Sequence, residues 1–467
     1  MSILKDSCEV NIDDCSAIKF DFIVIGSGAA GGATALTLGD LNHNVLVVEA
    51  GSLLLTEHVG SLSMKHQPSI LKSFCNKCSY QVPWISSTAS SNEQVWSVAG
   101  GRTLFWGGHA PRIFAHEFSK WPLNFNDLKA DYDWAEQLLH VENDFFANET
   151  EKTLIDNSLS NNMIAMASPL ALEFASHKTS ILPDLFFSSI SKLIAHPRFN
   201  KDLNQSGIHL LCDAKAQKLL HTQGEITGLE LLNTKTGKSI IINAEHYILA
   251  CGAFRSTQLV IDSDLSITSS LFRKNIGEHL FCKGLIRLHE PIEEPIYIYY
   301  PSTLKQSYMF EIQGPFKESW YDANYATVWL DWESNNNYLL LYGFGVADVS
   351  LANTIESTGK GYQINYNYTP HDYQTMLEMQ QSAEQLAAAV KGDLVNFEFQ
   401  NPGSSLHERG GMAMSEHPED GVVSPDGQFW DYPNLYCTDT AIWPDQGAAN
   451  SCLTITAIAH HLAKKMK

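Results

Sequence analysis

The sequence predicts an α/β fold with a parallel sheet near its start and an antiparallel sheet in its second half. The parallel sheet is indicated by Phe22–Ile25, a short apolar run typical of buried parallel strands, which leads directly into a glycine-rich turn. The antiparallel sheet is indicated by residues 291–300 and 325–345, where aromatic and β-branched residues alternate. Good helix formers from Gln374 to Val390 predict a helix.

The composition is that of a globular protein with a sizeable core. The 467 residues are 44% hydrophobic and 18% charged, and a chain of this length holds about two to four domains. The formal charge of -21 disfavours nucleic acid and anionic membrane surfaces as partners. The first twenty residues lack the apolar stretch of a signal peptide, and no apolar run is long enough to span a membrane. We therefore expect a soluble, cytoplasmic protein.

The cysteines point to reduced thiols. There are nine, an odd number scattered over the chain, which does not suggest a disulfide framework. Cys75 and Cys78 form a CxxC pair, but no second pair and no histidine at ligand spacing accompany it. We expect two ordinary thiols there rather than a zinc or redox site, and no metal.

The glycine-rich turn opens a complete βαβ unit. It spans Gly26–Gly31 and is followed by a predicted helix over Ala33–Leu41, a second apolar strand over Val45–Val48, and Glu49. Strand, glycines, helix, strand and terminal acid in this order are typical of a Rossmann-like dinucleotide-binding unit. The alternative is a glycine-rich turn that binds nothing.

Each part of this unit has a physical task. Gly26 permits the tight turn, Gly28 lets the backbone approach a pyrophosphate, and Gly31 allows the helix to pack on the strand. The helix N-terminus offers unpaired amides to the phosphate, and Glu49 can accept hydrogen bonds from ribose hydroxyls. The unit does not separate NAD from FAD, although its place near the chain start favours FAD.

Four later segments carry further signals. Four glycines fall within nine residues in the loop 98–112, which indicates close approach of the backbone to a flat or bulky group. An apolar strand ends in Gly252-Ala253 before a predicted helix. The stretch Asn275–His279 follows it, and the chain ends with a segment from Asn434 that holds Asp439 and Asn450-Ser451-Cys452-Leu453-Thr454-Ile455.

Together these motifs resemble the glucose-methanol-choline (GMC) family of FAD-dependent oxidoreductases, at both ends and in the middle of the chain. The resemblance implies a Rossmann-like FAD-binding domain of the GR2/GMC type and a discontinuous α+β substrate domain built on an antiparallel sheet. The expected FAD-binding segments are 18–112, 205–285 and 405–467, and the expected substrate-binding segments are 113–204 and 286–404. Residues 143–204 match the family poorly, and a lid or an oligomer contact remains open for them.

The resemblance and the fingerprint together imply a set of cofactor contacts. The expected residues are Gly26, Gly28, Ala29, Ala30, Gly31, Glu49, Ala50, Gly101, Arg102, Thr103, Trp106, Gly107, Gly108, Ala216, Ala250, Gly252, Asp439, Thr440, Asn450, Ser451 and Thr454.

Two departures from the family pattern are informative. The loop 101–106 looks more like the pyranose-oxidase branch, in which a histidine bound covalently to the flavin precedes the loop tryptophan; here that position is Phe105. Because phenylalanine cannot form this bond, we expect non-covalent FAD. The usual proline after the catalytic asparagine is Ser451.

By the resemblance, His407 and Asn450 are the catalytic pair. An imidazole with a pKa near neutrality suits removal of a hydroxyl proton, and a carboxamide can hold the substrate oxygen so that its carbon faces the flavin nitrogen that accepts the hydride. His109 is a possible substrate contact, and His279 is expected to be structural. The nearest competitor for the base is His417, while His460 and His461 belong to the final helix.

The resulting hypothesis is oxidation of an alcohol group of a sugar, glycoside, polyol or other small molecule, with dioxygen or a quinone-like compound as electron acceptor. A lyase or decarboxylase that keeps FAD without net oxidation is the alternative. A flavin-binding protein that only holds partners is a third reading. Oligomers are possible.

Overall fold

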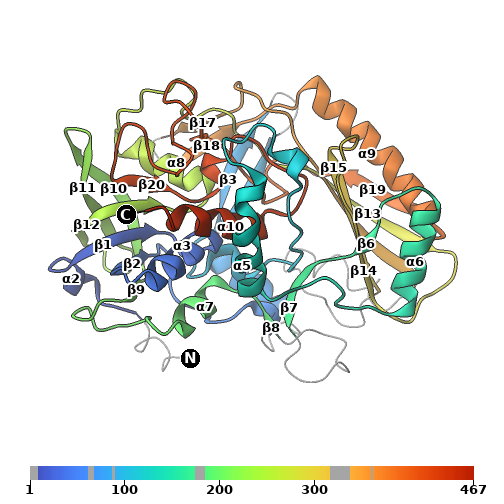
Figure 1. Cartoon of the computed structure of the whole chain (residues 1–467), viewed down its shortest axis with the longest axis horizontal. Helices are drawn as coiled ribbons and strands as arrows, with labels where there is room; N and C mark the ends of the chain where they lie inside the picture. The colour runs from blue at the N-terminus through green and yellow to red at the C-terminus, as the bar shows by residue number, and fades with distance from the viewer. Residues whose placement is uncertain are drawn as a thin grey trace.

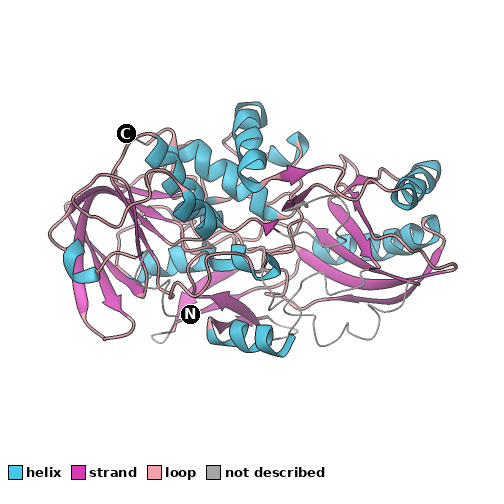
Figure 2. Ribbon diagram, turned by 90° about the horizontal axis from the view of Figure 1, so that it is seen from below, coloured by secondary structure: helices cyan, strands magenta, loops and turns pink. Residues whose placement is uncertain are grey.

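The computed structural model describes residues 9–61, 68–86, 90–173, 185–315, 337–358 and 361–466. Two large sheets lie toward opposite ends of the longest axis, with helices and loops between and around them (Figure 1). The view from below shows the same separation (Figure 2). Two separate sheets are therefore present, as expected from the sequence.

The first sheet is largely parallel and has the strand order β10-β11-β12-β1-β2-β9, with β20 paired to β12. Its strands are β1 Lys19–Ile25, β2 Val45–Val48, β9 Ile208–Leu211, β10 Ala214–Thr222, β11 Glu225–Asn233, β12 Ser239–Leu249 and β20 Leu435–Cys437. The pairs of β1 with β2 and β12, β2 with β9, and β12 with β20 are parallel. Segments from the start, middle and end of the chain thus form one sheet.

Helices α3 Ala29–Asp40 and α10 Ser451–Ala463 pack against each other beside this sheet, as the blue and red helices of Figure 1 show. The hydroxyl of Thr37 lies 2.7 Å from His460 Nδ1 across this contact. Helix α3 begins at Ala29, four residues before the predicted Ala33, because Gly28 of the glycine turn is already its N-cap and the residues that follow are small. Helices α8 Ala253–Asp262 and α5 Lys129–Leu139 complete this half.

The second sheet is antiparallel, in the order β19-β13-β16-β15-β14-β6. Its strands are β6 Met166–Ala167, β13 Leu280–Leu288, β14 Ile296–Tyr300, β15 Tyr308–Gly314, β16 Tyr338–Gly345 and β19 Gly392–Phe399. The antiparallel prediction is confirmed for β14 and β16, while the earlier part of the predicted strand 325–345 lies outside the described residues. The expected domain boundary at residue 285 falls inside β13, which already belongs to this sheet at Leu280.

Alternation gives this sheet two different faces. Phe310 and Ile312 of β15 and Leu341 of β16 lie in a core cluster with helix α9 Pro370–Ala389, which begins four residues before the predicted 374–390 helix and ends one residue before its predicted end. The alternate residues of the same strands, which point to the other face, belong to a separate cluster that includes Phe281. One face is therefore packed by a helix, and the other is left to form the wall of a cavity.

The remaining α-helices and strands lie around and between the two large sheets (Figure 1). They are α2 Ile12–Cys15, α4 Pro68–Lys77, β3 Ser79–Ile85, β4 Ser90–Trp96, β5 Val141–Glu142, α6 Glu149–Ser160, β7 Leu170–Glu173, β8 Leu185–Phe186, α7 Ser189–Ala195, β17 Thr354–Ser357 and β18 Tyr362–Asn365. Within residues 143–204, α6 packs against α9 and β14, and α7 packs against α3.

The cysteines of the described residues are free thiols, and those residues contain no group of three or more side chains that could hold a metal ion. Cys78 Sγ donates to the carbonyl of Phe74 near the end of α4. Among the helices of the same residues, none combines the length and the apolar composition needed to cross a bilayer.

Replacing Gly31 by alanine should destabilise the first sheet. The added Cβ would lie 1.9 Å from the carbonyl oxygen of Gly26, which forces α3 away from the turn. We expect a loss of about 1–3 kcal/mol in the free energy of unfolding, the range for overpacked cores, measured by denaturant or thermal melting. The control is Gly361→Ala, whose Cβ would meet no atom within 4 Å. Equal melting temperatures for the two variants would contradict this account of the packing.

Candidate active site

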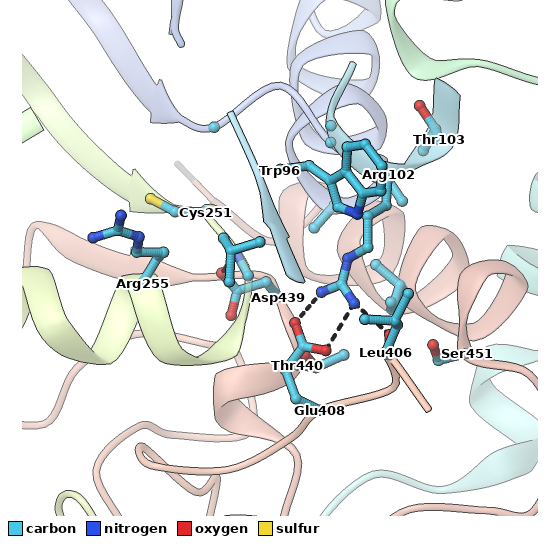
Figure 3. Close-up of a pocket in the computed structure, with 18 of the residues that line it drawn as sticks. Trp96, Arg102, Thr103, Cys251, Arg255, Leu406, Glu408, Asp439, Thr440 and Ser451 are labelled. Atoms are coloured by element: carbon cyan, nitrogen blue, oxygen red, sulfur yellow. Dashed lines mark hydrogen bonds and ion pairs between the residues drawn. The ribbon is translucent and has the colours of Figure 1, made fainter. Parts of the chain in front are cut away.

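A cavity of about 780 Å³ lies where the carboxyl ends of the parallel strands face the antiparallel sheet. Its wall combines the glycine turn, the loop 101–107, the start of α10 and the free face of the antiparallel sheet. Figure 3 shows part of this wall, with side chains contributed by segments far apart in the sequence. Cavities of this size accept ligands of drug or cofactor dimensions.

The glycines of the turn serve two purposes: one allows close packing against a neighbouring strand end, and another leaves the backbone open to the cavity. Gly26 has a φ of 108°, and a Cβ there would lie 2.3 Å from the carbonyl oxygen of Ala250. At Gly28 a Cβ would meet nothing within 4 Å, so the backbone faces open space. No side chain caps α3 at this point. The amides of its first turn therefore remain available to an anion.

Glu49 follows β2 and is anchored beside the turn. Its carboxylate accepts hydrogen bonds from the Ser27 hydroxyl at 2.6 Å and the Gly51 amide at 2.8 Å. Burial raises the pKa of Glu49, and these hydrogen bonds oppose the shift. The carboxylate is thus held in the cavity wall at the edge of the parallel sheet, where the sequence placed it.

Arg102 joins the glycine-rich loop to the loop that carries His407. Its guanidinium donates to both carboxylate oxygens of Glu408 and to the carbonyl of Leu406 (Figure 3). Leu406 has a φ of 58°, which is uncommon for a residue with a side chain and is found where surrounding contacts enforce it. The Arg102 contacts therefore fix the backbone immediately before His407.

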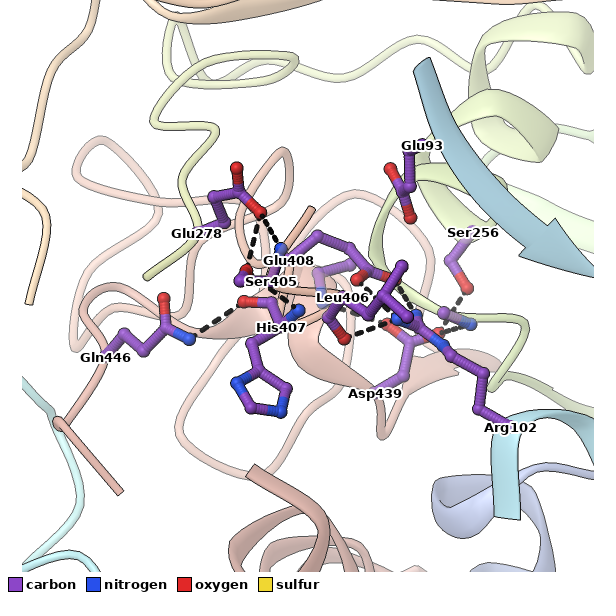
Figure 4. A network of polar contacts seen from close by, with 12 residues as sticks. Glu93, Arg102, Ser256, Glu278, Ser405, Leu406, His407, Glu408, Asp439 and Gln446 are labelled. Carbon is purple, nitrogen blue, oxygen red and sulfur yellow. Dashed lines mark hydrogen bonds and ion pairs between the residues drawn. The ribbon is translucent and has the colours of Figure 1, made fainter. Parts of the chain in front are cut away.

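The backbone of this loop is also held from the other side. Glu278 accepts hydrogen bonds from the amide and hydroxyl of Ser405, and the Ser405 hydroxyl in turn accepts from the His407 amide at 3.2 Å. Gln446 donates to the His407 carbonyl at 2.8 Å. Figure 4 shows the imidazole of His407 projecting away from these backbone contacts.

The imidazole of His407 meets a second histidine. His407 Nδ1 lies 2.9 Å from His279 Nδ1, and His279 Nε2 lies 2.6 Å from the carbonyl oxygen of Gly447. Burial lowers the pKa of His407 well below its usual range, with His279, Arg102 and His109 adding to the effect. The ring is therefore neutral at neutral pH and able to accept a proton.

Asn450 occupies the N-cap position of α10, but its side chain makes no capping hydrogen bond. Its Oδ1 instead lies 3.0 Å from Nδ1 of His109. The same nitrogen lies 2.5 Å from the Glu311 carboxylate, which also accepts from the Tyr297 hydroxyl at 2.9 Å. Since N-cap asparagines usually bond to the helix backbone, the orientation of Asn450 is set by this buried cluster.

The opposite wall comes from the antiparallel sheet. It contributes Phe281, Tyr297, Glu311, Gln313, Leu340, Tyr342 and Phe344. The Phe344 ring lies 5.1 Å from that of His407, measured between centroids. This wall is mostly aromatic and apolar, with one carboxylate and one carboxamide among its members.

The cavity wall includes His407, Asn450 and all of the cofactor contacts expected from the sequence except Gly31, Gly108 and Thr454. Gly31 packs against Gly26, Gly108 faces the side chain of Leu172, and the Thr454 hydroxyl lies 2.9 Å from that of Tyr132. These three residues shape the surrounding packing instead.

Of the other candidate histidines, one lines the cavity and the rest lie outside its wall. His109 lines the cavity, whereas His417 is exposed and lies outside its wall. His279 is 1% exposed and contacts His407. His461 lies 2.8 Å from Asp131, within the packing of the final helix against α5.

Several wall residues were not foreseen from the sequence. Glu93, Glu311 and Glu408 are buried carboxylates that line the cavity. For Glu408 the available signal is its position directly after His407. For Glu311, alternation along β15 could have indicated an unusual acid on a sheet face.

Models of the GMC oxidoreductase family match this chain at residues 193–283 and 349–459. These stretches include the end of β12, the Asn275–His279 segment, His407 and Asn450. The chain belongs to the GMC oxidoreductase family.

Similar proteins span several activities. A C-glycoside 3-oxidase of Arthrobacter globiformis is 33% identical over 106 residues, which cover 22% of this chain and 20% of that protein. A 2-methyl-1,2-propanediol dehydrogenase of Mycolicibacterium austroafricanum is 20% identical, with 95% of this chain and 94% of that protein covered. A 6'''-hydroxyparomomycin C oxidase of Streptomyces lividus is 23% identical, with 95% and 92% covered.

Solved structures agree on the fold. Pyridoxine 4-oxidase from Mesorbium loti superposes with a TM-score of 0.69 at 14% identity, over 96% of this chain and 99% of that one. A formate oxidase variant from Aspergillus oryzae gives a TM-score of 0.71 at 13% identity, over 96% and 98%.

GMC oxidoreductases bind FAD, and the cavity of this family member fits such a cofactor. The uncapped N-terminus of α3 and the open surface at Gly28 suit a pyrophosphate, and Glu49 suits a ribose. The remainder of the cavity extends past Gly101 and Trp106 to Ser451, which leaves room for a planar ring system between the two sheets.

The pH dependence of stability should report the burial of Glu278. Burial raises its pKa from 4.5 to about 7, so its contribution to stability is present in full below pH 4.5 and is lost as the pH rises through about 7. The shift corresponds to about 3 kcal/mol. The stability of the natural protein relative to Glu278→Gln should therefore fall between pH 5 and pH 8 in thermal melts. A difference that does not change with pH would contradict this assignment.

Proposed function

We propose that the protein oxidises a CH–OH group of a small hydroxylated molecule to a carbonyl, with His407 as the proton acceptor and Asn450 as the group that holds the substrate oxygen. The observation that carries the proposal is that both side chains line the same cavity as the nucleotide-binding turn. When bound there, FAD would accept the hydride.

His407 accepts the hydroxyl proton as the carbon–hydrogen bond breaks. Its neutral imidazole, held between aromatic and histidine rings, has a lone pair free for this proton, although its lowered pKa makes it a weaker base than the near-neutral imidazole expected from the sequence. Asn450 donates a hydrogen bond to the substrate oxygen and so fixes the orientation of the carbon. The antiparallel wall excludes water from the reacting atoms, because most of its side chains are apolar or aromatic.

The substrate is proposed to be a sugar, glycoside, polyol or similar alcohol. Aromatic side chains such as Tyr342 and Phe344 offer flat apolar surface, while Glu311 and Gln313 offer hydrogen-bond acceptors and a donor for additional hydroxyls. The names of the similar C-glycoside 3-oxidase and 6'''-hydroxyparomomycin C oxidase favour the same class. Dioxygen or a quinone-like compound is the proposed electron acceptor.

The cofactor-binding part of the chain is proposed to be residues 18–112, 205–285 and 405–467, with residues 280–285 entering the antiparallel sheet. Residues 113–204 and 286–404 form the substrate-binding part. The catalytic pair then lies in the cofactor-binding part, while the acids and aromatics that select the substrate come from the other.

FAD is proposed to bind without a covalent link at Phe105. The ring of Phe105 stacks on Trp96 with centroids 4.1 Å apart, so this position supplies packing and no nucleophile. After denaturation with acid or heat, FAD should appear in the supernatant and be measurable by its absorbance. Yellow colour retained in the protein pellet would show a covalent link and overturn the proposal.

Replacing His407 by alanine should abolish alcohol-dependent loss of flavin absorbance under anaerobic conditions. The expected fall in the rate is on the order of 10²–10⁴-fold, the contribution of a general base, with FAD content unchanged. The matched control is the exposed His417→Ala. A rate of reduction that His407→Ala leaves unchanged would place the base elsewhere. A carbonyl product that does not form in step with acceptor consumption would instead favour a reaction without net oxidation.

A further inference from the structure

Both members of the proposed catalytic pair contact a second buried histidine. His279 is 1% exposed and touches His407, and His109 is 2% exposed and touches Asn450. Neither contact is explained by proton transfer to a substrate alone. What each contact determines is where protons sit on the two catalytic side chains.

The protons of the His279–His407 pair follow from one acceptor. The Gly447 carbonyl can only accept, so the 2.6 Å contact places a proton on His279 Nε2. Burial lowers the pKa of His279 to about 4, so its ring is neutral and its Nδ1 carries a lone pair. At 2.9 Å, His407 Nδ1 must then donate to it. The lone pair of neutral His407 is therefore on Nε2.

The His109–Asn450 contact can be resolved in the same way. Nδ1 of His109 lies 2.5 Å from a carboxylate oxygen of Glu311 and 3.0 Å from Oδ1 of Asn450. A nitrogen in contact with two oxygens carries the proton, since a lone pair there would face two others. The Asn450 oxygen is therefore occupied by His109. The NH₂ group of Asn450 is left for other partners.

We propose that His279 and His109 are positioning residues that make His407 a hydrogen-bond acceptor and Asn450 a hydrogen-bond donor toward the substrate. The inference rests on the proposed function of the pair. An alcohol oxygen both donates one proton and accepts hydrogen bonds, so an acceptor at His407 Nε2 and a donor at Asn450 Nδ2 match it. If His407 Nε2 carried a proton, or if Asn450 presented its oxygen, a donor would face the hydroxyl proton or an acceptor would face the lone pairs of the alcohol oxygen.

The His279 half is tested first by nuclear magnetic resonance of the FAD-loaded protein labelled with ¹⁵N-histidine. The signals of His407 are assigned by their loss in His407→Ala. We expect His407 to be protonated at Nδ1 and not at Nε2, because the two nitrogen types have different ¹⁵N shifts. A His407 protonated at Nε2 in the natural protein would overturn the proposal.

Two variants separate tautomer control from packing. His279→Asn keeps an acceptor oxygen near the position of Nδ1, and His279→Leu removes it. We expect His279→Leu to lose on the order of 10²-fold in the rate of flavin reduction and to lose the Nδ1-protonated signal of His407. His279→Asn should keep the rate of flavin reduction within about tenfold of the natural rate. It should also keep the Nδ1-protonated signal of His407. Equal rates in the two variants, with the His407 signal unchanged, would contradict a positioning role for His279.

The His109 half is tested by a double-mutant cycle with Asn450. His109→Phe keeps a ring but removes the donor, and should slow reduction in the natural background. In the Asn450→Ala background the same substitution should change the rate by less than about twofold, because its effect passes through Asn450. Additive losses would show that His109 acts on the substrate directly and would overturn this half.

The proposed function and this inference fail in different ways. If His407→Ala reduces the flavin normally, the proposed function is wrong whatever the tautomer. If His407→Ala is inactive while His279→Leu and His109→Phe behave like the natural protein, the pair is catalytic and the positioning roles are wrong.

Discussion

The hydrogen bonds between the segment Asn275–His279 and the loop Gly403–Gly411 hold the side of the cavity that carries His407 in place. Gly277 and Arg409 exchange backbone hydrogen bonds at 3.1 and 2.8 Å. The buried guanidinium of Arg409 donates a hydrogen bond to Oδ1 of Asn275 at 2.9 Å. The adjacent Glu278 and His279 hold the backbone and the ring around His407. Because one short segment makes all of these contacts, the position of His407 depends on it as a unit.

The two sheets have different tasks around one cavity. The parallel sheet supplies the glycine turn, the N-terminus of α3 and Glu49, which are suited to phosphate and ribose. The antiparallel sheet supplies a wall of aromatic side chains with Glu311 and Gln313. His407 and Asn450 lie on C-terminal segments that reach the cavity between the two. In the proposed function, the reacting atoms would lie where the surface for the cofactor meets the surface for the substrate.

The sequence was informative where chemistry is local. The turn Gly26–Gly31, the strand Val45–Val48 and Glu49 follow one another within a single unit, and their spacing could be interpreted without tertiary contacts. His407 and Asn450 were reached through resemblance, because no periodicity joins two residues that far apart.

The site residues that the sequence did not predict are brought together only by tertiary contacts. Glu311 becomes part of the candidate site only because β15 brings its carboxylate next to His109. His279 was expected to be structural, and its contact with His407 comes from the pairing of Gly277 with Arg409. Burial of Glu93 beside Arg102 and Glu408 is likewise a tertiary effect that local sequence does not encode.

In the proposed mechanism, the imidazole of His407 and the carboxamide of Asn450 bind one alcohol oxygen from two sides. The most direct measurement is a crystal structure of the protein with FAD and a non-reacting substrate analogue. The account predicts an analogue oxygen about 2.6–3.2 Å from both His407 Nε2 and Asn450 Nδ2. An analogue whose oxygen lies beyond hydrogen-bond reach of either atom, or which meets His407 through Nδ1, would contradict it.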